Sequence, residues 1–193
     1  MMADMQSARS YTKVRRAAAE EATRERIVSA IVGLHEEIGP ARTTVSAIAD
    51  RAGVERLTVY RHFPDEPSML RACSAHWTAL HPLPSMPAEG SEPVAVFRRT
   101  ILRLYDWYRA NAAMLAQITT DARKMPLVAE LIAPIDVELD RVAAELDAKW
   151  PRRSSRRATT IRHVLEFSTW RSLDRLTGSG RRAAALAVGW IGP

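Results

Sequence analysis

Apolar positions recur every three or four residues along most of the chain, a period that predicts helices rather than strands. The first such stripe consists of Ile27, Ile31, Leu34 and Ile38. It predicts a helix from about Ala17 to Ile38, ended by Gly39-Pro40. Neither an alternating strand pattern nor an internal repeat is visible in the sequence. The chain is therefore predicted to be all-α.

The same period predicts further helices downstream. Their approximate ranges are 66–80, 94–111, 114–124, 126–150, 158–177 and 181–190. The segment 81–93 contains four prolines, which exclude a helix and make it the best candidate for a boundary loop. We place the domains themselves at residues 1–66 and 67–193.

Residues 44–63 read as two short helices joined by a tight turn. Thr44 is a suitable N-cap for the first helix, because its hydroxyl can accept an unpaired N–H of the first turn. Gly53 stands where this helix must stop, since glycine adopts positive φ at low cost. In the second helix, Leu57, Val59 and Phe63 are the expected buried positions. This order of elements predicts a helix-turn-helix at about 44–63.

An ordinary helical hairpin inside a bundle is the alternative, because glycine turns serve that arrangement too. The second helix decides between them, since arginine, threonine, tyrosine and histidine gather on it. Polar side chains of this kind reach base edges and phosphates when the helix lies in the DNA major groove. The pattern therefore favours a DNA-binding domain.

The composition is that expected of a soluble globular protein. Apolar residues make up 47% of the 193 residues and charged residues 26%, and no apolar run approaches the roughly 18 residues of a membrane span. The N-terminus lacks the apolar centre of a secretory signal, and the single cysteine excludes an internal disulfide. We expect a cytoplasmic protein without a membrane partner.

The net charge of +6 is unevenly distributed. Residues 1–80 hold 11 basic and 10 acidic side chains, whereas residues 151–193 hold 9 and 2. The predicted DNA-binding part is thus not the most basic part, which weakens a purely electrostatic argument for DNA. Arg9, Lys13, Arg15 and Arg16 lie in a predicted flexible arm, 1–16, that either follows phosphates or is a solvated tail.

The whole pattern resembles the TetR family. A capped helix, then T-T-V-S-A-I-A-D-R-A-G-V, then L-T-V-Y-R-H-F and a new helix match the family over about a quarter of the chain. The resemblance implies an N-terminal three-helix DNA-binding domain and an all-helical C-terminal domain that binds a small molecule and dimerises. It also implies that Phe63 is the aromatic residue that closes the core of the first domain.

Site residues follow from the resemblance by position. Base-reading roles are implied for Arg56, Thr58 and Arg61, and phosphate contacts for Tyr60, His62, Thr44 and Ser46. The family commonly has lysine where this chain has Glu66, at the start of the next helix. A glutamate would be repelled by a phosphate there, although it suits the positive end of its own helix.

Aromatic and apolar side chains gather in the helices that surround the ligand cavity in TetR-type proteins. The candidate ligand-binding residues are Trp77, Tyr105, Trp107, Tyr108, Met114, Gln117, Ile118 and Asp121. Ligand pockets are apolar and aromatic with few polar groups, but aromatic residues at helical spacing also form ordinary cores. As a cluster they indicate an apolar or aromatic effector.

The last two predicted helices carry apolar residues on more than one face. Such a helix buries one face against something outside its own domain, and TetR-type proteins form homodimers through this part. The candidate dimerisation residues are Ile161, Leu165, Trp170, Leu173, Leu186 and Trp190. The basic run 152–157 reads as a solvated loop, with phosphate or membrane-surface binding as a minor alternative.

Catalytic and metal signals are weak. The fragment His35-Glu36-Glu37-Ile38-Gly39 begins like a zinc-protease motif but has glycine where the second histidine is needed. Cys73 and His76 supply only two ligands, so we expect a buried thiol beside a histidine rather than zinc. No phosphate-binding loop or nucleophile-and-base motif is readable, so neither an enzyme nor a cofactor is expected.

The sequence therefore predicts a dimeric transcriptional regulator that binds a double-stranded DNA operator and is released from it by a small apolar or aromatic effector. The alternative is a helical small-molecule-binding or interaction protein of the same fold that has lost specific operator binding. Glu66 and the nearly neutral N-terminal domain are the features that favour the alternative.

Overall fold

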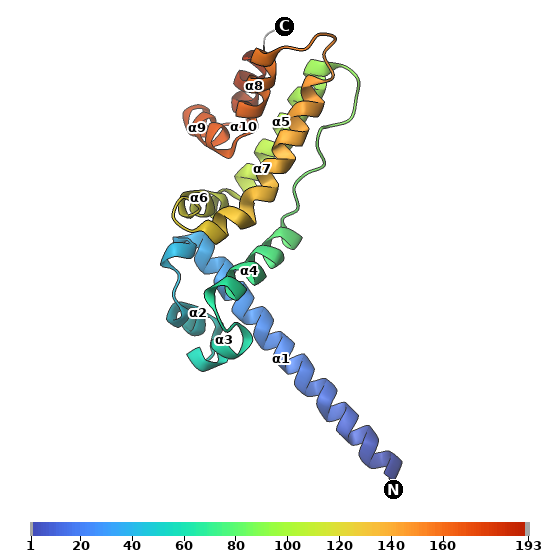
Figure 1. The fold of residues 1–193 in the computed structure, drawn as a ribbon, viewed down its shortest axis with the longest axis vertical. Coiled ribbons are helices and arrows are strands. Elements are labelled where there is room, and N and C mark those ends of the chain that lie inside the picture. The colour runs from blue at the N-terminus through green and yellow to red at the C-terminus, as the bar shows by residue number, and fades with distance from the viewer. Residues whose placement is uncertain (1, 192–193) are drawn as a thin grey trace. The chain divides into compact units, whose positions relative to one another are not determined.

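A computed structural model describes the backbone of residues 2–191 and the side chains of residues 13–191. Within these residues all regular structure is helical, which confirms the predicted fold class, and the chain divides into unit 1, Met1–Leu80, and unit 2, His81–Pro193 (Figure 1). Unit 1 holds α1 (Met2–Ile38), the short η1 (Pro40–Arg42), α2 (Val45–Ala52), α3 (Arg56–His62) and α4 (Glu66–Leu80). Unit 2 holds α5 (Pro93–Ala110), α6 (Ala112–Asp121), α7 (Pro126–Asp147), α8 (Ser155–Val164), α9 (Phe167–Thr177) and α10 (Gly180–Gly189).

Unit 1 is built on the C-terminal half of α1, which contacts both α2 and α4. Ile27 and Ile31 of its predicted stripe are fully buried, and they join Ile48 of α2 and Val59 of α3 in one apolar cluster. Burying a side chain of this size stabilises a fold by about 1.5–3 kcal/mol. The cluster therefore fixes the positions of α2 and α3 relative to α1.

The start of α1 differs from the prediction. The helix begins at Met2 rather than at about Ala17, so residues 2–16 are helical where a flexible arm was expected. The sequence contains no glycine or proline between residues 2 and 32 to interrupt a helix. It also carries no apolar stripe before Ile27, and that stripe was the signal on which the prediction depended.

The division between the units also differs from the predicted boundary after Glu66. It falls between Leu80 and His81, so α4 belongs to unit 1. The physical reason is packing, because Met69 and Cys73 of α4 are buried in the same cluster as α1. The proline-rich segment 81–92 then begins unit 2.

Unit 2 surrounds α5, which contacts α6, α7, α9 and α10. Val96, Phe97, Ile101 and Leu104 of α5 are fully buried. α10 contacts α5, and Ala183, Ala184 and Ala187 of α10 are buried; small residues of this kind let two helices approach closely. α5 is therefore the central helix of this unit.

One predicted helix, 158–177, is divided in two in the structure. α8 ends at Val164 and α9 begins at Phe167, and two buried tyrosines of α5 hold the junction. The Tyr105 hydroxyl donates to the Val164 carbonyl at 3.0 Å, and the Tyr108 hydroxyl donates to the Leu165 carbonyl at 2.6 Å. Burial raises the pKa of both tyrosines, so both hydroxyls stay protonated donors.

Residues 81–92 form an extended strap that is tied to unit 2. Its backbone carbonyls accept hydrogen bonds from cationic side chains: Arg141 donates to Met86 at 2.8 Å and Lys149 donates to Gly90 at 3.1 Å. At its first residue, Trp107 Nε1 donates to the His81 carbonyl at 3.3 Å. The proline content excludes a helix, as predicted, but these bonds give the strap a fixed path.

Candidate functional site

The turn between α2 and α3 follows from two residues that the sequence singled out. Thr44 has an extended backbone, and its Oγ1 accepts a hydrogen bond from the Ala47 N–H at 3.2 Å, which caps α2. Gly53 ends α2 with φ of 64°, a left-handed conformation that costs glycine little. Glu55 then precedes α3 in extended backbone. The two helices and their turn form the predicted helix-turn-helix.

The inner face of α3 carries Val59 and, just after the helix, Phe63, which are 0% and 2% exposed. They lie four residues apart and therefore share one side of the chain. Leu57, which was expected to be buried with them, is 74% exposed, so that prediction was wrong. It lies two residues from Val59, about half a turn around the helix, and therefore faces away from the core.

The remaining side chains of α3 form its outer face. Arg56, Tyr60 and Arg61 are exposed, while Thr58 and His62 are half-buried. Arg61 Nη2 donates to Thr58 Oγ1 at 2.9 Å, so these two side chains are oriented together. All five predicted contacts on this helix are thus at least partly accessible, together with the apolar Leu57.

The start of α2 offers two more of the predicted phosphate contacts. Thr44 and Ser46 are both exposed. The Thr44 hydroxyl already accepts a hydrogen bond as the helix cap, but its own O–H remains a donor for a phosphate. On α1, Lys13, Arg15 and Arg16 are exposed, whereas the Arg9 side chain lies outside the described residues. The DNA roles of all these residues stay predictions.

The start of α4 assigns capping to Asp65 rather than to Glu66. Asp65 Oδ1 accepts from the Ser68 N–H at 2.8 Å, and Ser68 Oγ donates back to the Asp65 carbonyl at 2.7 Å. These backbone and side-chain hydrogen bonds hold the pKa of Asp65 below its usual value. Glu66 is an exposed residue of the first turn, so its side chain is accessible to a backbone phosphate.

The buried thiol of unit 1 has a histidine partner, but not the one its spacing suggested. Cys73 Sγ lies 3.3 Å from His35 Nδ1, and both residues are buried, while His76 is half-buried on α4. Burial raises the pKa of Cys73 to about 12, so the group is an unreactive thiol. Among residues 13–191, no group of three or more metal-ligating side chains is close enough to hold an ion.

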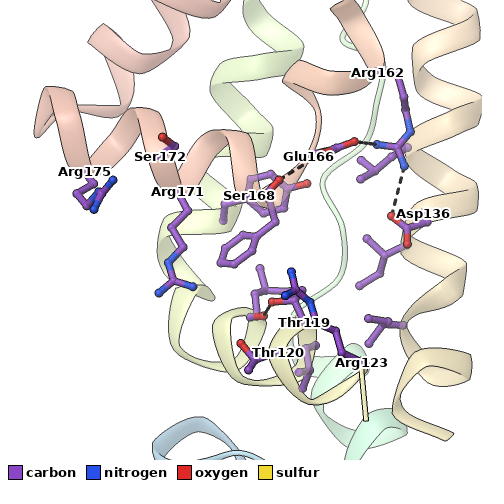
Figure 2. A pocket seen from close by; sticks show the side chains of 17 residues that line it. Thr119, Thr120, Arg123, Asp136, Arg162, Glu166, Ser168, Arg171, Ser172 and Arg175 are labelled. Carbon is purple, nitrogen blue, oxygen red and sulfur yellow. Dashed lines mark hydrogen bonds and ion pairs between the residues drawn. The ribbon is translucent and has the colours of Figure 1, made fainter. Parts of the chain in front are cut away.

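Unit 2 contains a cavity of about 640 Å³, within the range of small-molecule sites (Figure 2). Its apolar lining consists of Tyr108, Leu115, Ile118, Ile132, Ile135, Leu139 and Phe167. Its polar lining consists of Thr119, Thr120, Arg123, Asp136, Arg162, Glu166, Ser168, Arg171, Ser172 and Arg175. The wall is therefore assembled from five helices, α5 to α9, and the chain between them.

Only two of the predicted ligand residues, Tyr108 and Ile118, belong to this lining. Tyr105 is fully buried beside the α8–α9 junction, and Trp107 is half-buried with its N–H on the strap. Met114 is buried on α6, where Gln117 and Asp121 are half-buried. Trp77 is buried and belongs to unit 1. Ligand binding by the eight residues stays a prediction, and two of them line the cavity.

The four arginines of the lining were missed by the sequence reading. Arg171 and Arg175 are one turn apart on α9, a spacing that was available as a signal, but Arg123 and Arg162 come from other segments. Arg162 Nη2 lies 3.4 Å from Asp136 Oδ1, and Arg162 Nη1 lies 3.7 Å from Glu166 Oε1. Burial works against the charged form of Arg162, yet its neighbouring carboxylates, Asp140 foremost, raise its pKa.

The predicted dimerisation residues separate into two groups. Ile161, Leu165, Trp170 and Leu173 are buried within their own unit. Leu186 and Trp190 are 49% and 43% exposed, and Leu176, near the end of α9, is 73% exposed. The dimer itself stays a prediction. Of the predicted dimerisation residues, only Leu186 and Trp190 are accessible to a second copy.

Comparisons with known proteins agree with this geometry. Residues 27–73 match the family described as bacterial regulatory proteins, tetR family. An uncharacterized HTH-type transcriptional regulator of Mycobacterium bovis is 28% identical over 169 residues, covering 84% of this chain and 87% of the relative. A relative from Mycobacterium tuberculosis with the same description shows 28% identity and the same coverage.

Solved structures show the same fold. A TetR-like transcriptional regulator from Rhodococcus sp. RHA1 matches with a TM-score of 0.62 at 17% identity, covering 88% of this chain and 93% of that one. The fatty acid degradation regulator FadR from Bacillus halodurans matches with a TM-score of 0.59 at 16% identity, covering 87% and 93%.

Fold and sequence together define a helix-turn-helix transcriptional regulator with a helical second domain. Residues 27–73 match the DNA-binding domain of the tetR family, as the motif predicted, and the chain as a whole is similar to HTH-type transcriptional regulators. Within the described residues, none of the helices combines the length and apolarity needed to cross a membrane.

Proposed function

We propose that the protein is a homodimeric repressor that reads an operator with α3 and is released by a small molecule bound in the cavity of unit 2. It acts without catalysing a reaction. The observation that carries the proposal is the division of α3 into a buried face, with Val59, and an accessible polar face. A helix that is anchored on one side and polar on the other suits insertion into a major groove.

Specificity would come from the start of α3. Arg56 is exposed in the first turn, and an arginine can bind both acceptors of a guanine edge. Leu57 offers an apolar contact of the kind that recognises a thymine methyl group. Tyr60, which is 43% exposed, suits a backbone phosphate.

Release would depend on coupling between the cavity and α3. α4 follows α3 after three residues and ends at Leu80, immediately before the strap. A ligand that alters unit 2 therefore acts on the strap, then on α4, and finally on the separation of the two reading helices in the dimer. Ligand and operator must weaken each other by the same factor, about 5- to 150-fold for typical coupling energies.

A dimer would place two reading helices on neighbouring turns of DNA, about 34–36 Å apart. The exposed side chains of Leu176, Leu186 and Trp190 supply apolar area for contact with a second copy. The variant Leu176→Glu/Leu186→Glu should sediment as a monomer and bind the operator weakly. A double variant that remains a dimer would move the interface elsewhere.

The central experiment selects operator fragments from a genomic library with the purified protein and measures their affinity by fluorescence anisotropy. Arg56→Ala/Tyr60→Ala should abolish selective binding, while Arg98→Ala, an exposed arginine of α5, should leave it intact. If no fragment is bound selectively by the wild-type protein, the chain is a ligand-binding protein that kept the fold. The exposed Glu66 is the feature that favours this second function.

A further inference from the structure

The polar part of the cavity lining carries more positive than negative charge. It contains four arginines, Arg123, Arg162, Arg171 and Arg175, but only two carboxylates, Asp136 and Glu166. Figure 2 shows Arg123 beside the end of α6 and Arg171 extending from α9, both among the side chains that line the cavity. Cationic groups from separate helices thus gather on one cavity.

Both carboxylates already face an arginine. Arg162 lies 3.4 Å from Asp136 and 3.7 Å from Glu166, and it also pairs with Asp140. Its Nη1 is buried and makes no hydrogen bond with any described residue, since the Glu166 contact exceeds hydrogen-bonding distance. The acidic groups of the lining are therefore compensated, and one buried donor of Arg162 makes no hydrogen bond.

The other three arginines have no such compensation. Arg123, Arg171 and Arg175 make no hydrogen bond or ion pair with any residue between 13 and 191. Some other arginines of unit 2 are paired, as Arg157 is with Asp147 at 2.7 Å and Arg141 is with Glu138 and Glu145. Isolated surface arginines are usually just solvated, but these three share one cavity with an apolar wall.

The rest of the cavity lining is apolar and therefore favours an apolar part of a ligand. Leu115, Ile118 and Ile135 lie on α6 and α7, and the rings of Tyr108 and Phe167 are 5.4 Å apart. Filling this part with hydrocarbon removes apolar surface from water on both sides of the contact. Guanidinium groups bind carboxylate and phosphate oxygens through paired N–H donors.

The geometry points to an amphipathic anion as the effector: an apolar or aromatic body against α6 and α7, and a carboxylate or phosphate group between Arg123 and Arg171. This inference rests on the proposed function, because it names the chemical class of the effector of the same cavity. It also narrows the sequence-based expectation of a purely apolar or aromatic compound, since such a compound would leave the arginines unpaired.

The test compares four probes that share one hydrocarbon chain: octanoate, octyl phosphate, octanol and octylammonium. Binding to the wild-type protein is measured by isothermal titration calorimetry. At least one anion should bind about tenfold tighter or more than octanol, and octylammonium should bind weakest, because ion-assisted hydrogen bonds exceed neutral ones. The two anions distinguish a carboxylate from a phosphate site. Equal binding of octanol and both anions would overturn the inference.

Variants locate the charge. Arg123→Gln and Arg171→Gln should each weaken anion binding about tenfold and leave octanol binding unchanged, because both side chains are exposed and unpaired. Arg98→Gln, an exposed arginine of α5 outside the lining, should change neither. Unchanged anion binding in both lining variants, or an equal loss for octanol, would contradict the assignment.

Operator release is measured separately, by adding the tightest anion to the protein–DNA complex. An anion that binds through Arg123 and Arg171 without lowering operator affinity would contradict the proposed repression mechanism but not the anion site. Release by octanol, with neither anion binding more tightly than octanol, would leave the mechanism standing and overturn the anion site. The two proposals therefore fail in different ways.

Discussion

The two candidate sites of this protein are built on different length scales. The reading site lies on seven residues of one helix, α3, whose position is fixed by a cap, a glycine turn and a buried face. The cavity is assembled from five helices that span Tyr108 to Arg175. A site on one helix can be predicted from a short stretch of sequence, whereas a site assembled from several helices depends on how those helices pack. The comparison can be tested unit by unit.

The largest effect should come from the anchor of the reading helix. Phe63→Ala should lower the free energy of unfolding of unit 1 by about 3–5 kcal/mol, because the ring is buried and leaves a cavity. Leu57→Ala is the matched control, since it removes an exposed apolar side chain and should change stability by less than about 0.5 kcal/mol. Chemical denaturation measures both. Similar losses in the two variants would contradict the assigned faces of α3.

Base reading should give the next largest effect. Arg56→Ala should cost about 1–3 kcal/mol on the best operator and relax the preference at one base pair. His62→Ala, at the other end of α3, should instead weaken binding to all sequences alike. Affinity is measured across single-base operator variants at one salt concentration. A uniform loss for Arg56→Ala, with base preference intact, would make it a phosphate contact.

In unit 2, the α8–α9 junction supplies a smaller test. Tyr105→Phe should reduce the stability of this unit by about 1 kcal/mol, because the buried Val164 carbonyl loses its donor. Ligand affinity should change little, since Tyr105 is outside the cavity lining. Tyr60→Phe, which removes a hydroxyl from an exposed tyrosine of α3, serves as the control. Thermal unfolding measures stability, and calorimetry measures ligand affinity. An unchanged melting temperature would contradict a stabilising role of Tyr105 at the junction.

The smallest expected effect concerns Glu66. If it faces a phosphate, Glu66→Lys should raise operator affinity a few-fold and steepen the salt dependence by about one unit of slope. Helix stability should be kept, because Asp65 and Ser68 provide the capping bonds of α4. The measurement is operator affinity between low and moderate salt. An unchanged slope would place residue 66 away from the DNA.

The sequence was sufficient for features with local causes. Thr44 and Gly53 marked the limits of α2, and both have the predicted conformations. Leu57 was misplaced because hydrophobicity alone does not say which side of a helix faces the core. An angular count from Val59 would have excluded it from the buried face.

Features that depend on residues far apart in the sequence were harder to predict. The division of the 158–177 segment depends on hydroxyl donors that stand more than fifty residues earlier in the chain. The cavity arginines were visible only as an excess of positive charge in residues 151–193, where they were not connected with a ligand. That excess weakens a purely electrostatic argument for DNA, and three of the four lining arginines account for part of it.

The strap carries a consequence for the operator. Its first residue, His81, follows Leu80 of α4 directly and is held by the indole of Trp107. A flexible linker of n residues tolerates displacements of about 5–6 Å multiplied by the square root of n, but here no spare residue separates the helix from its attachment. The covalent connection between α4 and the attached strap is therefore short. We expect an operator whose half-sites are moved apart by one base pair to bind more weakly, because a short connection limits how far each DNA-binding unit can shift to follow them.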